Sequence, residues 1–298
     1  MIVNGVAIED TFAEAFGMRA TRLLLTADTA HWARIAAENL TGFATSVIGC
    51  GCEAGIEREL PEAETPDGRP GVSVLIFAVN SAELAKQVLA RVGQSVLTSP
   101  GSACYSGLDA PESIPLGKSL RYFGDSFQLS KQILGRRYWR VPVMDGEFLV
   151  EETAGMVRAV GGGNLLILGT TRSEVLRATE HAVSAIRKLP NVILPFPGGI
   201  VRSGSKVGSR YKGLIASTND AYCPTLKGVV ASRLQPGTES VLEIVIDGLT
   251  ADDVAAAMRA GIAALCEVGA AGGIHAISAG NYGGKLGPFH FHLRELAP

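Results

Sequence analysis

The sequence has few cysteines, little net charge and no long apolar run. Five cysteines among 298 residues are an odd number, and they stand apart in apolar or Gly-rich surroundings. A disulfide framework is therefore not indicated, and we expect reduced thiols. A net charge of -2 argues against nucleic-acid binding, which usually requires a basic domain. No apolar run approaches the ~20 residues of a membrane helix. We expect a soluble globular protein with neither nucleic acid nor membrane as a partner.

Signals for export and for metal binding are also lacking. Glu9 and Asp10 lie where a secretory signal would carry a basic head and an unbroken apolar stretch, so a cytoplasmic location is expected. Cys50 and Cys52 have no second cysteine pair at ligand spacing, and the His290–His292 pair has no third ligand nearby in sequence. We therefore predict no metal site.

What the sequence does contain is an internal similarity. Segments 9–40 and 151–186 both carry an acidic pair and a Thr, then Gly-Met, Arg-Ala, an apolar run and an amphipathic stretch, about 140 residues apart. Segments 71–93 and 239–261 resemble each other in the same way. These matches predict a duplication, with an N-terminal lobe over residues 1–147 and a C-terminal lobe over residues 148–298.

Capping residues and apolar runs give the order of elements in each half. Thr171 and Glu174 form a capping box for a helix that runs to Lys188, before Pro190. Strand-length runs include "LLLTA", "TSVIGC", "LLILG" and "VLEIVI". Each half thus reads strand, helix, strand, strand, helix, strand, which predicts an α+β protein of two similar ferredoxin-like (split βαβ) lobes. Residues 100–135 are interpreted as an excursion of the first lobe. The other expected N-caps are Asp28, Ser81 and Thr250.

Two Gly-rich segments interrupt the second half. The first, "PFPGGIVRSGSKVGSRYKGLIASTNDAYCPT" (195–225), is a long loop in an otherwise apolar chain, and such loops are usually functional. The second is "SAGNYGGKLG" (278–287). Their backbone N–H groups can approach a ligand closely, and Lys206 and Lys285 could help to hold an anion. Neither segment has a nucleotide-binding motif, and both could simply be tight turns between strands.

The long loop also carries charged and reactive residues. Arg202, Lys206, Arg210 and Lys212 suit a multiply anionic small molecule, but they could equally be a solvated face. The Asn219–Asp220 pair could form a turn. A nucleophilic Cys223 is disfavoured because none of the five histidines lies in this loop, and an inert thiol is the simpler interpretation.

Glu243 is the most specific candidate for catalysis. In "VLEIVIDG" it interrupts a strand in which Val241 and Val245 lie on the same face. Desolvation would favour its protonated form, and a neutral carboxylic acid can donate a hydrogen bond to an oxyanion. The alternative is a strand-edge glutamate that points to water, which the similarly spaced Asp247 would support.

Together these residues resemble a known family. The resemblance extends from the second residue to the last strand, and its blocks are long and unusual. The family is that of formylmethanofuran:tetrahydromethanopterin formyltransferases, which have two similar α/β lobes, form homotetramers and use no metal or prosthetic group. The blocks are "NGVAIEDTFAEAF", "TGFATSVI", "EAGIE", "ETPDGRPGV", "PFPGGIV", "SGSKVGS", "ASTNDAYCPT", "EIVI" followed by Gly248, and "ISAGN" with "GGKLG".

The resemblance implies transfer of a formyl group between the amine of methanofuran and N5 of tetrahydromethanopterin, both of them substrates, with no tightly bound cofactor. The family's proposed catalytic glutamate corresponds to Glu243. The expected substrate-binding residues are Gly198, Gly199, Ser205, Lys206, Arg210, Lys212, Asn219, Asp220, Tyr222, Cys223, Asn281 and Lys285.

One departure from the family concerns composition. Many archaeal members are strongly acidic, whereas this chain is nearly neutral and rich in Ala, Gly and Arg, which suggests a bacterial methylotroph. Bacterial relatives belong to a formyltransferase/hydrolase complex, so other subunits of such a complex and a methanofuran analogue are further expected partners. A non-catalytic carrier-binding or scaffold subunit is the alternative function.

Overall fold

The computed structural model describes all 298 residues and is a mixed α and β protein, as the sequence predicts. Contacts group the chain into two compact units: unit 1 contains residues 1–17 and 160–298, and unit 2 contains residues 18–159. This grouping differs from the predicted division at 147/148 because two long strands, β3 (Phe12–Thr26) and β11 (Ala154–Gly169), each run through both units. The division of the sequence at 147/148 stays a prediction.

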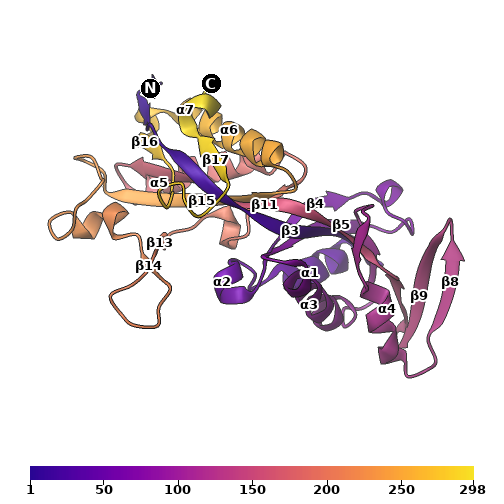
Figure 1. The fold of residues 1–298 in the computed structure, drawn as a ribbon. Coiled ribbons are helices and arrows are strands. Elements are labelled where there is room, and N and C mark those ends of the chain that lie inside the picture. Colours follow the sequence, from indigo (N-terminus) through magenta and orange to yellow (C-terminus); the bar gives the residue numbers. More distant parts are fainter. The chain divides into compact units, whose positions relative to one another are not determined.

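Unit 1 contains a sheet with the strand order β12, β15, β11, β16, β2. Figure 1 labels three of these strands, β15, β11 and β16. Helices α5 and α6 cover one face, where apolar side chains of β15 and β11 pack against them. Residues that alternate with these side chains point to the opposite face. The elements of unit 1 besides β3 and β11 are β1 (Ile2–Val3), β2 (Val6–Ile8), α5 (Arg172–Ile186), β12 (Val192–Ile193), β13 (Ser205–Val207), β14 (Ala216–Thr218), β15 (Ser240–Gly248), α6 (Ala251–Val268), β16 (Ile274–Ser278), β17 (Phe289–His292) and α7 (Leu293–Leu296).

Unit 2 repeats this strand order with β4, β5, β3 and β6, followed by β10, β9 and β8. Its core contains side chains of α1, α3 and the sheet. The elements of unit 2 besides β3 and β11 are α1 (Ala30–Thr41), α2 (Val47–Cys50), β4 (Glu53–Leu60), β5 (Gly71–Ala78), α3 (Ser81–Arg91), β6 (Ala103–Ser106), β7 (Glu112–Ile114), α4 (Leu116–Leu120), β8 (Leu129–Ile133), β9 (Arg136–Val143) and β10 (Gly146–Glu151).

The predicted helix starts are correct to within one residue. Thr171 and Thr250 cap α5 and α6, each accepting a hydrogen bond from a backbone N–H of the first turn. The caps of α1 and α3 lie one residue from the predicted positions, at Thr29 instead of Asp28 and at Asn80 instead of Ser81.

One prediction for unit 2 is wrong. The run "TSVIGC" forms the short helix α2 instead of a strand, because Ser46 caps it and Gly51 ends it in a left-handed conformation (φ 78°). Residues 100–135, interpreted as an excursion of the first lobe, include β6 (Ala103–Ser106), a buried strand paired with β3, and the excursion stays a prediction. The four residues of β6 are too few to stand out in a Ser/Gly-rich stretch.

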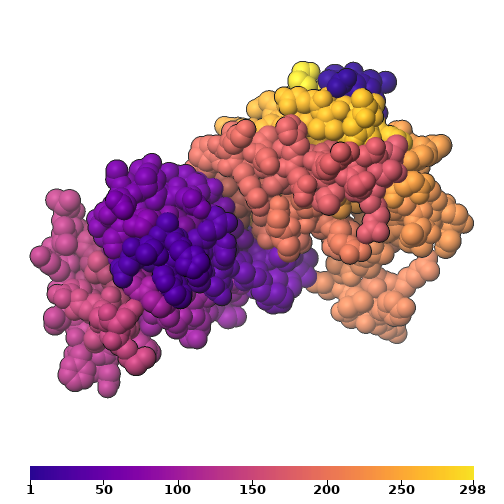
Figure 2. All heavy atoms as spheres, turned by 180° about the vertical axis from the view of Figure 1, so that it is seen from behind, coloured from indigo at the N-terminus to yellow at the C-terminus, as the bar shows by residue number.

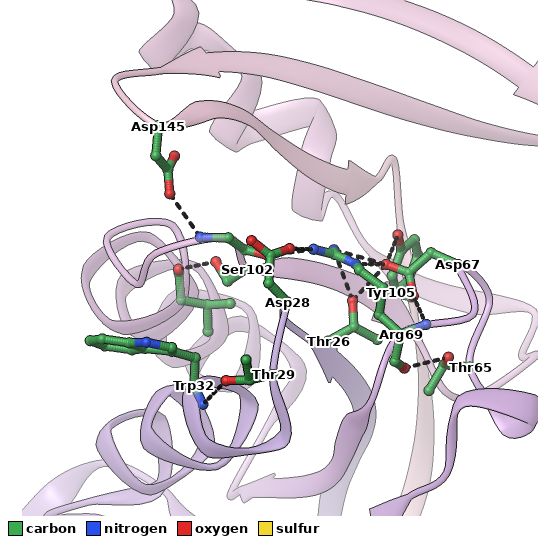
Figure 3. A network of polar contacts seen from close by, with 12 residues as sticks. Thr26, Asp28, Thr29, Trp32, Thr65, Asp67, Arg69, Ser102, Tyr105 and Asp145 are labelled. Carbon is green, nitrogen blue, oxygen red and sulfur yellow. Dashed lines mark hydrogen bonds and ion pairs between the residues drawn. The ribbon is translucent and has the colours of Figure 1, made fainter.

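The block "ETPDGRPGV" forms a polar network in unit 2 (Figure 3). Asp67 Oδ2 accepts hydrogen bonds from Thr26 Oγ1 at 2.7 Å and from the Tyr105 hydroxyl at 2.9 Å, and Arg69 pairs with it at 2.8 Å. Burial opposes ionisation of Asp67, but these donors outweigh it and lower its pKa. The network ties the β4–β5 loop to β3 and β6, so the distinctive sequence of this block has a structural role.

None of the helices has both the length and the apolarity needed to cross a membrane.

Candidate functional site

Glu243 lies at the centre of the unit 1 sheet. It is directly opposite Leu166 of β11, and Leu166 is directly opposite Ser278 of β16. Directly opposed residues share a face of the sheet, so these three side chains form a row. The neighbouring Ile244 is fully buried against the helices, which places the row on the face that the helices do not cover.

The Glu243 carboxyl group is half-buried and has no hydrogen-bond or ion-pair partner. It lines a small cavity of about 40 Å³ and forms no side-chain hydrogen bond or ion pair. Burial raises its pKa from 4.5 to about 7, because desolvation disfavours the charged form. The strand-edge alternative does not fit, since β15 is paired on both sides at this position and Asp247 is fully buried.

A turn rich in glycine brings the next segment against Glu243. Backbone hydrogen bonds join Val201 and Glu243 in both directions, at 2.7 and 2.9 Å. The chain reaches Val201 through Gly198 (φ 64°) and Gly199 (φ 86°), both in the left-handed region. The two predicted glycines thus form the turn that leads into the cavity wall. The cavity is lined by Leu166, Val201, Arg202, Ser203, Gly204, Asn219, Tyr222, Cys223, Val241, Leu242 and Glu243.

Residues 219–223 close the cavity from the other end of the long loop. The buried Tyr222 lies against Leu166, and its hydroxyl is 3.2 Å from Ser278 Oγ. Cys223 Sγ is 3.4 Å from Thr218 Oγ1. No histidine lines the cavity, so no base is placed to activate this thiol. Of the predicted residues, the structure therefore brings Arg202, Asn219, Tyr222 and Cys223 together with Glu243.

The other predicted cationic residues of the long loop do not line the cavity. Lys206 on β13 pairs with Asp220 at 2.7 Å, so its charge is partly neutralised, and Ser205 lies opposite Thr218 of β14. Arg210 and Lys212 are exposed on the loop that joins β13 and β14 and form no ion pair. They do not line the cavity. Figures 1 and 2 show this loop (orange) standing out from the body of its unit.

The second Gly-rich loop, residues 279–287, is organised around a residue that the prediction missed. Glu14 of β3 is almost fully buried, and its two carboxylate oxygens accept four backbone hydrogen bonds from this loop at 2.6–2.8 Å. Burial would raise the pKa of Glu14, but the four N–H donors lower it to about 2. The donors are the amides of Tyr282, Gly284, Leu286 and Gly287.

The side chains of the other residues in this loop differ in their hydrogen bonds and in their exposure to solvent. Asn281, a predicted substrate-binding residue, donates to Thr11 Oγ1 at 3.0 Å and to the Phe12 carbonyl at 3.2 Å, so its amide is engaged within the fold. Lys285 is exposed and forms no ion pair. Tyr282 is 39% exposed, and its ring lies tilted against that of Phe16, with the ring centroids 6.1 Å apart. No sequence prediction singled out Tyr282.

A recognisable signal for Glu14 was present in the sequence. In "FAEAF" a carboxylate interrupts a strand of small and apolar residues, the same pattern that singled out Glu243. Asn164, also missed, lies two residues before Leu166 on the same face and holds Gly280 through hydrogen bonds of 2.6 and 3.1 Å. A lone Asn after "GGG" gives little indication of such a role.

Comparison with known proteins accounts for nearly the whole chain. The family model for formylmethanofuran-tetrahydromethanopterin formyltransferase matches residues 1–143, and the model for the proximal lobe of the same family matches residues 146–296. A formylmethanofuran–tetrahydromethanopterin formyltransferase of Methylococcus capsulatus is 67% identical over 296 residues, 99% of each chain.

Two solved structures have the same fold. The chain superposes with a TM-score of 0.97 and 57% identity on a chain of the Methylorubrum extorquens formyltransferase/hydrolase complex, solved with methylofuran, covering 99% of this chain and 98% of that one. The formyltransferase of Methanosarcina barkeri gives a TM-score of 0.93 at 47% identity, covering 99% and 100%. The chain belongs to the formylmethanofuran–tetrahydromethanopterin formyltransferase family.

Proposed function

We propose that the protein transfers a formyl group between N5 of tetrahydromethanopterin and the amine of methanofuran or an analogue, with Glu243 as the catalytic acid. The observation that carries this proposal is a carboxyl group with a pKa of about 7 that lines a cavity and has no partner. A structural carboxylate would be paired, whereas an acid that must donate a proton to a substrate is left free.

The chemistry needs little more than positioned donors. The amine nitrogen of one carrier attacks the formyl carbon on the other, which gives a tetrahedral oxyanion bonded to both nitrogens. Protonated Glu243 donates a hydrogen bond to this oxyanion. As the intermediate collapses, the bond from carbon to the first nitrogen breaks. That nitrogen takes up a proton, while the attacking nitrogen loses one, and Glu243 is the group we assign to this exchange.

The long loop supplies the groups that would hold the carriers. Asn219, Tyr222 and Cys223 line the Glu243 cavity, and the exposed Arg210, Lys212 and Lys285 suit anionic parts of a carrier. We assign Gly198, Gly199, Ser205, Lys206, Asp220 and Asn281 to the support of this surface, because each is engaged in a turn, a strand pair or a hydrogen bond.

The test is an exchange assay with formyl-tetrahydromethanopterin and methanofuran. Wild type should transfer the formyl group, and Glu243→Gln and Glu243→Ala should both slow the reaction by ~10²–10³-fold. Gln can still donate a hydrogen bond but cannot pass on a proton, so equal losses point to proton transfer and a milder loss in Gln points to oxyanion stabilisation alone. A Glu243→Ala variant with wild-type kcat would remove Glu243 from the mechanism.

The second candidate function is a non-catalytic carrier-binding or scaffold subunit. It is favoured by the likeness to a chain of a multi-subunit formyltransferase/hydrolase complex. Wild-type protein that binds methanofuran without any exchange would support it. We further propose assembly into a homotetramer, as the family resemblance implies, and into such a complex, which the relative in that complex supports. Light scattering of the purified chain, alone and with partner subunits, tests both.

We also infer that the two units arose by duplication of a ferredoxin-like lobe. In each unit the strand that precedes the first helix lies between the third and fourth strands of the series: β15, β11, β16 in unit 1 and β5, β3, β6 in unit 2. The split βαβ arrangement has this order. Separate expression of residues 1–147 and 148–298 would test whether each half folds alone.

A further inference from the structure

We propose that Glu14 is a positioning residue whose carboxylate holds loop 279–287 so that the Tyr282 hydroxyl donates a second hydrogen bond, beside Glu243, to the reacting formyl group. This inference rests on the proposed formyl transfer and adds to it a second donor and the residue that places it. In this proposal the Gly-rich loop positions Tyr282 for catalysis. Its composition alone suggested instead that its backbone amides bind an anionic ligand.

The first step is the conformation of the loop. Four amides within six residues converge on the two oxygens of Glu14, two amides on each oxygen. The chain achieves this with Gly283 (φ 82°) and Gly284 (φ 71°) in the left-handed region. At Gly287 a Cβ atom would lie 2.3 Å from the Ala15 carbonyl oxygen, so only glycine permits the approach to β3. The loop is therefore built around the carboxylate.

The second step is that the start of the loop is also fixed. Asn164 of β11 binds both the N–H and the carbonyl of Gly280, and Asn281 binds Thr11 and Phe12. Tyr282 lies between these contacts and the Glu14 cradle. These hydrogen bonds fix the backbone on both sides of Tyr282, and none of them uses its hydroxyl, which remains able to donate to a substrate.

The third step places Tyr282 near Glu243. Ser278 and Glu243 both lie opposite Leu166, and Gly280 follows Ser278 by two residues beside Asn164, on the same face. The loop thus begins on the Glu243 face of the sheet. In agreement, burial raises the pKa of Tyr282, and the negative charges of Glu243 and Glu14 raise it further. The hydroxyl therefore remains protonated and can donate at neutral pH.

A tetrahedral oxyanion is best stabilised by more than one fixed donor. Glu243 provides a donor that can also exchange its proton. The Tyr282 hydroxyl would provide a donor that keeps its proton throughout, so no atom is transferred to or from it. Because Glu14 is ionised over the working pH range, its grip on the loop does not change while Glu243 titrates.

Steady-state kinetics test the donor. Tyr282→Phe should lower kcat by about 100-fold and leave KM within about threefold, because the lost hydrogen bond acts mainly in the transition state. Tyr122→Phe is the matched control, since Tyr122 is exposed on unit 2 and its loss should leave kcat unchanged. A Tyr282→Phe enzyme with the kcat of wild type overturns the assignment.

Amide hydrogen exchange tests the anchor. In wild type the amides of residues 282, 284, 286 and 287 should be protected, and Glu14→Gln should increase their exchange by at least about tenfold while lowering kcat. Glu151→Gln is the control, because Glu151 is also buried and accepts a backbone N–H at 2.9 Å, but in unit 2. If Glu14→Gln does not fold, Glu14→Asp can be used, because its side chain is one methylene group shorter and its carboxylate lies further from the four amides. It should also increase amide exchange in the loop and lower kcat. Unchanged exchange and kcat would refute the anchor.

A measurement without turnover separates this inference from the proposed function. The pKa of the Tyr282 phenol, followed by NMR of protein with ¹³C-labelled tyrosine, should fall in Glu243→Gln relative to wild type, since the facing charge is lost. A fall supports the placement of Tyr282 even if the wild type shows no exchange of formyl groups. If the pKa of Tyr282 is the same in Glu243→Gln and in wild type, Tyr282 does not lie near Glu243, and the placement is wrong even if the enzyme is fully active.

Discussion

Glu14 and Glu243 are two glutamates in strands of the same unit, and the fold treats them in opposite ways. Glu14 is almost fully buried and Glu243 is half-buried. Glu14 receives four backbone hydrogen bonds and its pKa falls to about 2, whereas Glu243 receives none and its pKa rises to about 7. Burial raises the pKa in both cases, so the difference comes from the donors. One carboxylate is stabilised as an anion for structure, and the other is kept as an acid for chemistry.

The largest expected effect is on the rate of formyl transfer when Glu243 is removed and the fold is kept. Glu243→Ala should reduce kcat by ~10²–10³-fold, since an oxyanion donor is removed. Its free energy of unfolding above pH 7 should equal or exceed that of wild type, because a buried unpaired charge is removed as well. Urea unfolding and the exchange assay measure the two quantities on one preparation. A variant that is both inactive and unstable would mean that Glu243 has a structural role like that of Glu14.

For Glu14 the main expected effect is a loss of stability. Glu14→Gln should lower the free energy of unfolding by about 3–6 kcal/mol, because an amide can accept from at most two of the four N–H groups and each of the two lost hydrogen bonds to a charge contributes ~1.5–3 kcal/mol. Urea denaturation at neutral pH, compared with Glu151→Gln, measures the loss. Stability within 0.5 kcal/mol of wild type, on the order of an ordinary surface substitution, would show that the four amides find other partners.

The pH dependence of stability should have opposite signs for the two groups. The pKa of Glu243 is raised on folding, so its contribution is present below pH 4.5 and is lost as the pH rises to about 7. The pKa of Glu14 is lowered, so its contribution is present above pH 4.5 and is lost as the pH falls toward about 2. Unfolding curves from pH 2 to 8 should lose the upper slope in Glu243→Gln and the lower slope in Glu14→Gln. Slopes that persist in both variants would contradict the two pKa shifts.

The pH dependence of kcat should be set by the protonation of Glu243. If protonated Glu243 is the active form, kcat falls above pH 7, by about tenfold for each further pH unit. Glu243→Gln should show a flat profile over pH 6–8 at its reduced rate. A wild-type profile that stays level to pH 8 would mean that another group supplies the proton.

The local sequence signal is strong for Glu243 and weaker for Glu14. Glu243 interrupts a strongly apolar strand, and that local contrast is the signal. Glu14 lies between alanines, shortly after the acidic pair Glu9–Asp10, so the local pattern is ambiguous. Its four donors lie 268–273 residues further along the chain. Partners at that separation leave no trace in the periodicity of either segment.

The same limit explains the uneven success of the fold prediction. The N-caps of α5 and α6 depend on residues three positions apart and were predicted correctly. Strand β6 was missed because its pairing with β3 is non-local. For the cations, the sequence shows charge but not pairing, and so Lys206 could not be distinguished from Arg210 or Lys212 before the contact with Asp220 was known.

That pairing leads to the smallest predicted effect. Lys206→Ala should raise KM for the anionic carrier by no more than about threefold, because the ion pair with Asp220 at a partly exposed site already satisfies the ammonium, and such pairs contribute ~0–1 kcal/mol. Arg210→Ala and Lys212→Ala, which remove unpaired charges, should raise KM more than Lys206→Ala does. Asp220→Asn should release Lys206 and lower KM slightly. The order of KM values among these variants at low salt is the measurement, and a dominant loss in Lys206→Ala would mean that the carrier displaces Asp220 when it binds.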